Sequence, residues 1–390
     1  MIQTTRHSDY ASIIKQVYKE TRRIKGGKNA AYIPQLAKVD PKKFGISICT
    51  VQGDLYHAGD YTFEVAIESI SKLFSLAMAV KKHGTQAIFD KIGMEGSFMP
   101  FNSIVAAKLA PTHTINPFLN QGAMATTSLL YEKNHGKYKS KLVKNMSDYA
   151  DRKLKVGPKV YESESHTNST NMALAYLLHA NKRFYAPVIP SVDAYTYQCS
   201  VKVSSKDLAT MAAVFANGGI HPISKKKMLS NQETTYIINN LLPEGLYEYS
   251  DEWIMKTHGV APAKSGVGGG LLIVIPNLMG ICVWSPPLDE MGNSVRGIDF
   301  CERLVEKFNF HNFDSLIAGH STKLDPRVNE TQASSDDVQL LLWAASKGSI
   351  REVQAFPMTR GGQTSVMKAP KELTPEQLAE LHLRVDNEKE

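Results

Sequence analysis

The chain has 390 residues and a formal net charge of +7, with 43% hydrophobic and 21% charged residues. This length and apolar content allow one or two domains with a sizeable core and exclude a disordered chain. The lysines are spread widely, and the sequence has no basic stripe interleaved with aromatic residues. We therefore expect no nucleic-acid partner.

The cysteines and apolar segments indicate the cellular compartment that is expected and whether a metal site is expected. Four cysteines stand far apart in apolar segments, which predicts small buried thiols in a reducing compartment. The sequence has no Cys-x-x-Cys or His-Glu-x-x-His motif, so it predicts no metal site. The N-terminal residues lack the apolar stretch of a secretory signal, and the apolar tract 271–284 is too short to cross a bilayer. A cytoplasmic protein with no membrane partner is expected.

The first predicted elements are a helix, a hairpin and a second helix. An amphipathic helix is expected from residue 8 to about residue 28, where a Gly-Gly pair ends it. The segment 44–60 alternates in polarity and turns at a Gln-Gly-Asp sequence, which is typical of a β-hairpin. A helix then starts near Ser69 and stops near Gly84, with lysines in its last turn.

Helical patterns dominate the middle of the chain and strands return after it. Residues 85–220 are mainly helical, and the helix at 204–219 has a serine cap and an Asn-Gly-Gly stop. The stretch 263–287 predicts two buried strands joined by a tight Pro-Asn turn, and a helix over 297–310 follows. This order favours one sheet built from both ends of the domain, with a helical subdomain inserted at about 69–220.

A change in composition near residue 320 marks the end of the main domain. Beyond it the chain is rich in Ser, Thr, Asp and Asn, with one further helical pattern at 336–356 and a polar tail to Glu390. We expect a domain over 1–320 and a C-terminal extension over 321–390.

A Ser-x-x-Lys spacing opens the helix predicted after Ser69. A serine nucleophile needs a base within hydrogen-bond reach, and residues three apart on a helix are neighbours. Lys72 leads into the apolar run LFSLAMAV, where desolvation lowers the pKa of an ammonium group and allows lysine to act as a base. The same spacing at Ser12 and Lys15 lies in a more polar segment, so the apolar context is what distinguishes Ser69.

A second signal is the sequence AKSGVGGG at 263–270. Penicillin-recognising enzymes combine a Ser-x-x-Lys helix start with a Lys-Thr-Gly strand. A glycine-rich strand edge lets a substrate carbonyl approach backbone N–H groups, as an oxyanion hole requires. The two motifs together indicate acyl transfer through Ser69, and the structural alternative is a capped helix beside a tight strand turn.

Longer stretches of the chain resemble the serine-dependent glutaminase family. They run in the same order from about residue 10 to residue 317 and include AAYIPQLAKVDPKKFGISICTVQGD, ESISK, NPFLNQGAM, YESESHTNSTNMALAY and PAKSGVGGGLLIVIPNLMGICVW. The resemblance implies a β-lactamase- or transpeptidase-like α/β fold, with an antiparallel central sheet flanked by helices. It also implies hydrolysis of L-glutamine to L-glutamate and ammonia through a glutamyl ester, without a metal or organic cofactor.

The resemblance implies a role for each matched position. Ser69 is the expected nucleophile, Lys72 its base and Tyr247 a proton relay beside them. Tyr32 is a further active-site tyrosine, and the backbone N–H groups of Ser69 and Val267 are expected to form the oxyanion hole. The positions expected to bind substrate are Ser69, Asn120, Glu164, Asn171, Tyr195, Tyr247 and Val267.

The matched residue types suit a free amino acid. The carboxylate of Glu164 is a natural partner for a substrate ammonium group. Amide and phenol donors such as those of Asn120 and Tyr195 suit its α-carboxylate. The resemblance further implies a homodimer or homotetramer, with inorganic phosphate as a candidate activator.

Two segments depart from the family pattern. Relatives often have Glu-Pro-Ser-Gly before Phe-Asn, whereas this chain has EGSFMPFN at 95–102, which leaves gating and phosphate activation open. The helical pattern 336–356 resembles the first ankyrin-type unit of animal members. No TPLH-like repeat follows it, so we expect a single helical pair or a docked tail, because solenoids need several stacked units.

Two alternatives to a glutaminase remain. A penicillin-binding or β-lactam-hydrolysing protein is disfavoured because the sequence has no Ser-Asp-Asn motif and no visible export signal. A non-catalytic family member could act as an interaction protein through its tail. Every matched position has a side chain competent for its role, which favours the enzyme.

Overall fold

The computed structural model describes residues 7–97, 99–110, 112–308, 310, 357–360 and 363–366. Residues Arg6–Asn312 form one compact unit, and the two short strands between residues 357 and 366 belong to a second. Among the helices of the described residues, none combines the length and apolar character needed to cross a bilayer.

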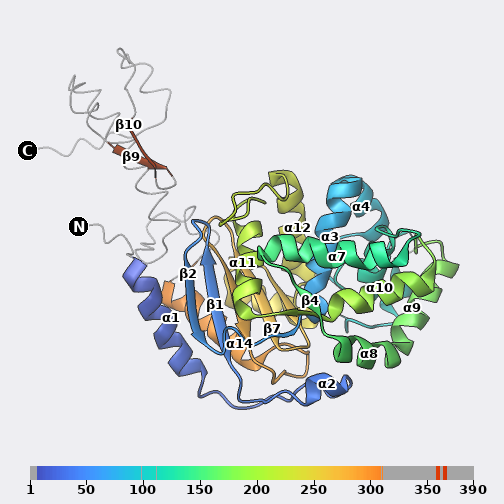
Figure 1. Ribbon diagram of the computed structural model, residues 1–390, viewed down its shortest axis with the longest axis horizontal. Helices are drawn as coiled ribbons and strands as arrows, with labels where there is room; N and C mark the ends of the chain where they lie inside the picture. The colour runs from blue at the N-terminus through green and yellow to red at the C-terminus, as the bar shows by residue number, and fades with distance from the viewer. Residues whose placement is uncertain are drawn as a thin grey trace, which may run out of the picture. The chain divides into compact units, whose positions relative to one another are not determined.

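A five-stranded antiparallel sheet forms the centre of the first unit, in the order β2–β1–β8–β7–β6 (Figure 1). Its strands are β1 Gly45–Thr50, β2 Leu55–Gly59, β6 Ala263–Gly266, β7 Gly270–Ile275 and β8 Met279–Trp284. The register of β1 on β8 runs from Gly45 opposite Trp284 to Thr50 opposite Met279. The N-terminal hairpin is thereby joined to strands far along the chain, which confirms the sheet predicted from both ends of the domain.

Two boundaries differ from the sequence prediction. The first helix, α1 His7–Thr21, ends well before the Gly-Gly pair, because the N–H groups of Arg23 and Ile24 bond to carbonyls three residues back and tighten the last turn. The stretch 263–287 forms three strands instead of two. Gly269, with a φ of +92°, turns the chain between β6 and β7.

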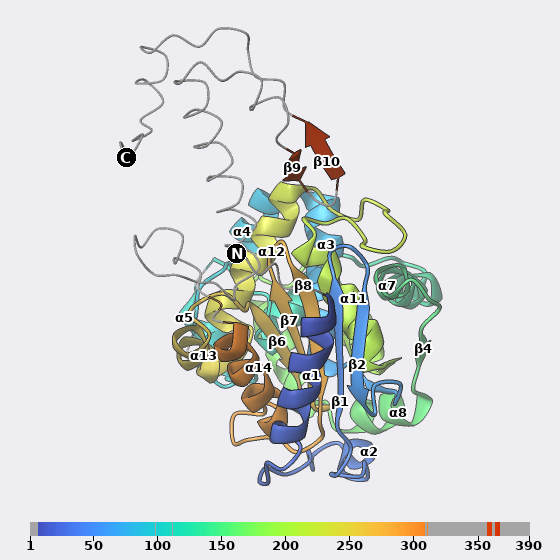
Figure 2. The ribbon, with the colours of Figure 1, turned by 90° about the vertical axis from the view of Figure 1, so that its left-hand side faces the viewer.

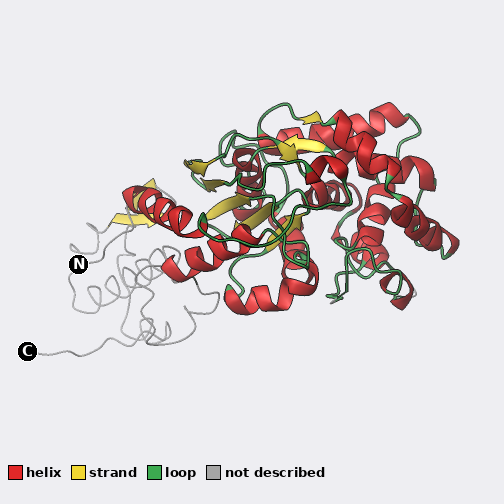
Figure 3. Ribbon diagram, turned by 90° about the horizontal axis from the view of Figure 1, so that it is seen from below, coloured by secondary structure: helices red, strands yellow, loops and turns green. Residues whose placement is uncertain are grey.

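Helices cover both faces of the sheet (Figures 2 and 3). α1 packs with α14 Val295–Phe308 on one face, and α11 Ser205–Ala216 lies against β1, β7 and β8 on the other. Strand side chains alternate, so neighbouring residues of β7 enter different cores: Ile273 joins the α1–α14 side and Leu272 the α11 side. All four cysteines are buried and unpaired, as predicted.

The middle of the chain is mainly helical, as predicted. Its helices are α3 Ser71–His83, α4 Thr85–Ile92, α5 Ala106–Leu109, α6 Asn120–Ser128, α7 His135–Ala150, α8 Pro158–His166, α9 Ser169–Ala180, α10 Val188–Cys199, α12 Asn231–Glu244 and α13 Ser250–Lys256, and α2 Pro34–Ala37 precedes the sheet. A small sheet, in the order β3–β5–β4, joins β3 Val65–Ala66, β5 Val201–Val203 and β4 Lys155–Val156. The predicted serine cap of α11 is present as a capping box between Ser204 and Asp207.

The described part of the second unit is a β-hairpin. β9 Pro357–Arg360 pairs with β10 Gln363–Val366 in antiparallel fashion, with Arg360 opposite Gln363. The helix predicted at 336–356, with its resemblance to an ankyrin-type unit, lies outside the described residues.

Candidate active site

Ser69 lies in a short 3₁₀ turn, η1 Glu68–Ile70, between β3 and α3. The α-helix itself begins at Ser71, so Ser69 lies two residues before the helix that the sequence predicted it would start. Ser69 is half-buried, whereas Lys72, in the first turn of α3, is fully buried. A solvent-reachable hydroxyl therefore lies beside an amine that water does not reach.

The amine of Lys72 is held by three acceptors. Its Nζ donates to the carbonyl oxygen of Phe118 at 2.7 Å, to Oδ1 of Asn120 at 2.7 Å and to the hydroxyl of Tyr247 at 3.2 Å. Burial lowers the pKa of Lys72 to about 7, while the nearby charges of Cys199 and other acidic groups oppose the shift. Lys72 can therefore be neutral at a pH at which an exposed lysine is charged.

Tyr247 connects Ser69 to Lys72. It opens the turn η2 Tyr247–Tyr249 with a φ of 55°, in the left-handed region, and it is buried. Burial raises the pKa of its phenol well above the ordinary range, and a hydrogen bond with Ser69 lowers it in part. The phenol therefore stays protonated, and it can accept a proton on one side while it donates one on the other.

A second buried lysine, Lys264, lies over the aromatic ring of Tyr247. Its Nζ lies 4.1 Å from the centre of the Tyr247 ring and donates to the carbonyl oxygens of Gly245 at 2.9 Å and Ser265 at 3.0 Å. Burial and then the charge of Lys72 lower the pKa of Lys264 well below its ordinary value. The AKSG sequence predicted a glycine-rich strand edge but no role for its lysine.

Asn120, Asn171 and Tyr195 come together from three helices. Asn120 is the first residue of α6, and its Oδ1 accepts from the Tyr195 hydroxyl at 3.4 Å as well as from Lys72. Its Nδ2 donates to Oδ1 of Asn171 at 2.9 Å. The sequence predicted these residues as substrate ligands, but it did not predict that Asn120 would hold the lysine.

The remaining groups are two carboxyls, one of them directly before Ser69 in the chain. Glu164, on α8, has its Oε2 enclosed without a hydrogen-bond partner, and burial raises the pKa of Glu164 to about 8. Glu68 is 2% exposed, and its Oε1 also lacks a partner. Glu68 was not among the predicted site residues, although its place directly before Ser69 in ESISK is a signal that could have identified it.

Tyr32 stands at the entrance. Its side chain is 53% exposed, because it lies on the loop before α2. Desolvation, followed by the charges of Glu68 and Glu164, raises the pKa of Tyr32. Tyr32 therefore reaches from the surface towards the two carboxyl groups.

Val267 lies in the turn between β6 and β7, next to the segment that carries Ser69. The backbone at Gly266 and Gly268 approaches Glu68 so closely that a Cβ at either glycine would lie within 3.5 Å of its side chain. A cavity of about 750 Å³ is lined by Val267, Tyr32 and residues of the neighbouring loops. Of the sequence-predicted site residues, Tyr32 and Val267 line this cavity, whereas Lys72, Asn120, Asn171, Tyr195 and Tyr247 are joined to one another by hydrogen bonds.

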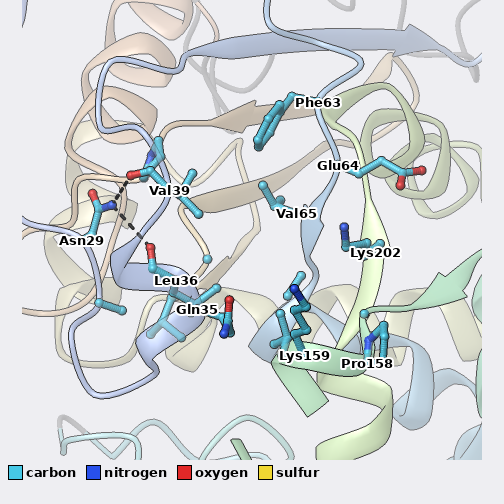
Figure 4. Close-up of a pocket in the computed structure, with 17 residues that line it drawn as sticks. Asn29, Gln35, Leu36, Val39, Phe63, Glu64, Val65, Pro158, Lys159 and Lys202 are labelled. Carbon is cyan, nitrogen blue, oxygen red and sulfur yellow. Dashed lines mark hydrogen bonds between the residues drawn. The ribbon is translucent and has the colours of Figure 1, made fainter. Parts of the chain in front are cut away.

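A second cavity, of about 430 Å³, shares Val267 with the first (Figure 4). Figure 4 shows Phe63 and Val65 on one wall, with Lys159 and Lys202 near them. Its described lining residues include no serine, cysteine or histidine. Neither Ser69 nor Lys72, the predicted nucleophile and base, lines it. Among the residues that the structure describes, no group of three or more His, Cys, Asp or Glu side chains is placed to hold a metal ion.

Comparison with known proteins gives consistent matches. A family model described as Glutaminase matches residues 27–313. A glutaminase from Colwellia psychrerythraea is 43% identical over 302 residues, which cover 77% of this chain and 96% of the relative. The solved structure of a probable glutaminase, ybaS, has a TM-score of 0.77 and 37% identity, and the match covers 79% of this chain and 99% of that one. A probable glutaminase from Bacillus subtilis, complexed with 6-diazo-5-oxo-L-norleucine, has a TM-score of 0.68 and 25% identity over 77% of this chain and 94% of that one.

Proposed function

Because the chain belongs to the glutaminase family and has its β-lactamase-like α/β fold, we propose that it hydrolyses L-glutamine to L-glutamate and ammonia through Ser69. The observation that carries the mechanism is the arrangement of Ser69, Tyr247 and Lys72. Tyr247 hydrogen bonds to both of the others, and Lys72 has a pKa of about 7. A base with a pKa near neutrality is best suited to general base catalysis at neutral pH.

In the first half of the reaction, the neutral amine of Lys72 takes the Ser69 proton through the Tyr247 hydroxyl. The Ser69 oxygen attacks the side-chain carbonyl carbon of glutamine, and the carbonyl oxygen becomes an oxyanion. Backbone N–H groups of Ser69 and Val267 are proposed to bind this oxyanion. The C–N bond then breaks, and the proton returns from Lys72 to the departing nitrogen, which leaves as ammonia.

In the second half, water replaces ammonia. Lys72, neutral again, takes a proton from the water, and the hydroxyl attacks the glutamyl ester. The ester bond to the Ser69 oxygen breaks, the proton returns to that oxygen, and L-glutamate is released. Since Tyr247 remains a phenol throughout, it passes protons without carrying a charge.

The amino-acid end of the substrate is proposed to bind across Glu164, Asn120, Asn171 and Tyr195. The hydrogen bonds that join Asn120 to Asn171 and Tyr195 support this, because they gather amide and phenol groups at one place. The enclosed and unpartnered oxygen of Glu164 suits an ammonium group.

Removing the nucleophile tests the proposal. Ser69→Ala and Lys72→Ala should each lower the rate of ammonia release from L-glutamine by at least about 10³-fold, because the groups act as one unit. Ser12→Ala and Lys15→Ala are matched controls, since they have the same spacing on the exposed side of α1 and should leave the rate unchanged. Ammonia release at the wild-type rate from a folded Ser69→Ala protein would overturn the assignment.

Covalent labelling locates the nucleophile directly. The diazoketone 6-diazo-5-oxo-L-norleucine, found with the B. subtilis relative, is an analogue of glutamine. It alkylates a nucleophilic oxygen with loss of N₂. We expect peptide mass spectrometry to find the label on Ser69, and no label in the Ser69→Ala protein. A non-catalytic member of the family would remain unlabelled.

Further parts of the proposal are supported by the family resemblance. They are a catalytic domain over 1–320 with an extension over 321–390, a homodimer or homotetramer, activation by inorganic phosphate and a place in the cytoplasm. Light scattering after size-exclusion chromatography measures the oligomer. The ammonia assay with and without phosphate measures the activation.

A further inference from the structure

Asp193, on α10, lies at the centre of a polar cluster between α7, α8 and α10. One of its carboxylate oxygens, Oδ2, lies 2.6 Å from Nε2 of His135 and accepts from Nζ of Lys139 at 3.0 Å. The other, Oδ1, accepts from the hydroxyl of Tyr161. His135 and Lys139 belong to α7 and Tyr161 to α8. These four residues, the Asp193 cluster, therefore join three helices through one carboxylate.

Aromatic rings lie beside the lysine of this cluster. Nζ of Lys139 lies 4.8 Å from the centre of the Tyr161 ring and 4.5 Å from the centre of the Tyr197 ring. It also donates to the Tyr161 hydroxyl at 3.0 Å. The two rings meet edge to face, with their centres 5.2 Å apart. Tyr161 is thus held by a carboxylate, an ammonium group and a second ring, and each of these contacts is favourable.

The carboxyl group of Asp193 stays ionised in this setting. Desolvation acts to raise the pKa of Asp193, but hydrogen bonds from Tyr161, Lys139 and His135 outweigh it and hold the pKa below its ordinary value. The side chain is 28% exposed, so water reaches the cluster only in part. A hydrogen bond to an ionised carboxylate is about twice as strong as one between neutral groups. The bond from Tyr161 to Asp193 is of this stronger kind.

Helix α8 depends on such contacts because it contributes nothing to the buried core. The structure describes all nine residues of α8, and none of them is buried. The helix lies against α2 and α10. On the α2 side, Val160 packs against the small apolar cluster that includes Leu36. On the α10 side, Tyr161 bonds to Asp193. Two neighbouring residues thereby fasten α8 on two sides.

Glu164 takes its position from α8. It follows Tyr161 by three residues, so the two are neighbours on the helix surface. Its Oε2 is enclosed and has no hydrogen-bond partner among the described residues. Since no hydrogen bond fixes this oxygen, its place is set by where the helix lies. Tyr195 follows Asp193 by two residues on α10, so the Asp193 cluster also sets how far Glu164 lies from Tyr195.

We propose that Asp193 is a positioning residue, which holds α8 against α10 through Tyr161 and thereby places Glu164 for the amino-acid end of the substrate. The inference rests on the proposed function, because it concerns how the same site binds L-glutamine. The proposed nucleophile, base and proton relay lie on η1, α3 and η2. A displaced α8 should therefore weaken substrate binding and leave the chemical step in place.

Steady-state kinetics of ammonia release give the first test. Tyr161→Phe removes only the hydroxyl, and Asp193→Asn keeps the shape of the side chain but removes its charge. Each should raise KM for L-glutamine about three- to tenfold, while kcat stays within about twofold. Tyr176→Phe, at an exposed tyrosine on α9, is the matched control and should change neither constant. If one of the two cluster variants fails to fold, the other provides the test.

A second measurement separates positioning of Glu164 from a general loosening of the protein. Calorimetric titration of the Ser69→Ala protein, which lacks the proposed nucleophile, gives the Kd of L-glutamine without turnover. Adding Tyr161→Phe should raise this Kd about three- to tenfold. In a protein that also carries Glu164→Gln, the same change should raise the Kd by less than about twofold, because the two residues act through one contact with the substrate.

Two outcomes would overturn the proposal. One is an unchanged KM in the folded Tyr161→Phe and Asp193→Asn proteins, or a fall of kcat without a rise of KM. The other is an equal rise of Kd with and without the Glu164 carboxylate, which would indicate a structural role alone. Failure of the unmodified protein to hydrolyse L-glutamine would instead overturn the proposed function.

Discussion

Lys72 is the residue on which the proposed chemistry depends most, because its buried amine is the proposed base. Its pKa of about 7 is set first by burial, and the acidic groups around it limit the shift. Below this pKa the amine is charged and cannot take a proton from Ser69, and above it the amine is neutral. The fold thus gives an ordinarily charged residue the pKa that the proposed base requires near neutral pH.

This state of Lys72 predicts a pH dependence. The value of kcat for L-glutamine should rise as the pH increases through about 7, because the fraction of neutral Lys72 rises. Asn120→Asp places a carboxylate where Oδ1 now accepts from Lys72, so it should raise the pKa of Lys72 and move the acid limb of the kcat profile upwards by about 1–3 pH units.

The shift is measured by the ammonia assay across pH at saturating substrate. Asn181→Asp, an exposed residue after α9, is the control and should leave the profile in place. An acid limb that stays at the same pH in a folded Asn120→Asp protein would show that Lys72 does not set the rate.

At the scale of elements, the fold depends on the close approach of α11 to the sheet. Every residue of α11 except Lys206 is buried, and the helix lies against β1, β7 and β8. At Gly280, on β8, a Cβ would meet the backbone nitrogen of Ala213 and the backbone oxygen of Ala209. The absence of a side chain at this one strand position is what lets the two backbones touch.

Gly280→Ala should therefore destabilise the fold by about 1–3 kcal/mol, since overpacking a rigid core forces backbone shifts. Gly136→Ala is the opposite case, because this glycine lies in the first turn of α7, where a Cβ would meet only Oδ1 of Asn134 at an ordinary contact distance of 3.6 Å. It should be neutral or stabilising by up to about 1 kcal/mol. Urea unfolding compares the three proteins, and a Gly280→Ala protein as stable as the wild type would contradict the packing argument.

At the scale of the whole unit, an ion pair joins the end of α7 to α11, the helix that packs on the sheet. Arg152, after α7, donates from Nε and Nη2 to the two carboxylate oxygens of Asp207 on α11, at 2.6 and 2.7 Å. Burial acts to raise the pKa of Asp207, but hydrogen bonds from Arg152 and Ser204 outweigh it and hold the pKa below its ordinary value. A lowered carboxyl pKa contributes stability above the ordinary pKa, and this contribution is lost as the pH falls.

Arg152→Met should lower the free energy of unfolding by about 1–3 kcal/mol at pH 7, a range that allows for the partial exposure of the arginine. The difference from the wild type should shrink as the pH falls below about 4, where Asp207 becomes protonated in the unfolded chain. Lys153→Met, at the exposed neighbouring position, should change little. A difference that is the same at pH 7 and pH 3 would rule out this ion pair as its source.

Much of this organisation follows from local sequence. The hairpin of β1 and β2, the serine cap of α11 and the Ser69–Lys72 spacing depend on residues a few positions apart, and the sequence predicted all three. The family match relied on longer stretches. It implied the nine proposed site residues, and their roles stay predictions until the variants are measured.

What the sequence by itself determined is the set of helices and strands and the chemical groups available, because periodicity, caps and turns act over short distances. Only the tertiary structure decided that Asn120 holds Lys72, that Lys264 lies over the ring of Tyr247, and that Glu68 is buried. These contacts join residues far apart in the chain or depend on which groups are removed from water. Desolvation sets the pKa values of the site, and burial is a property of the packed molecule.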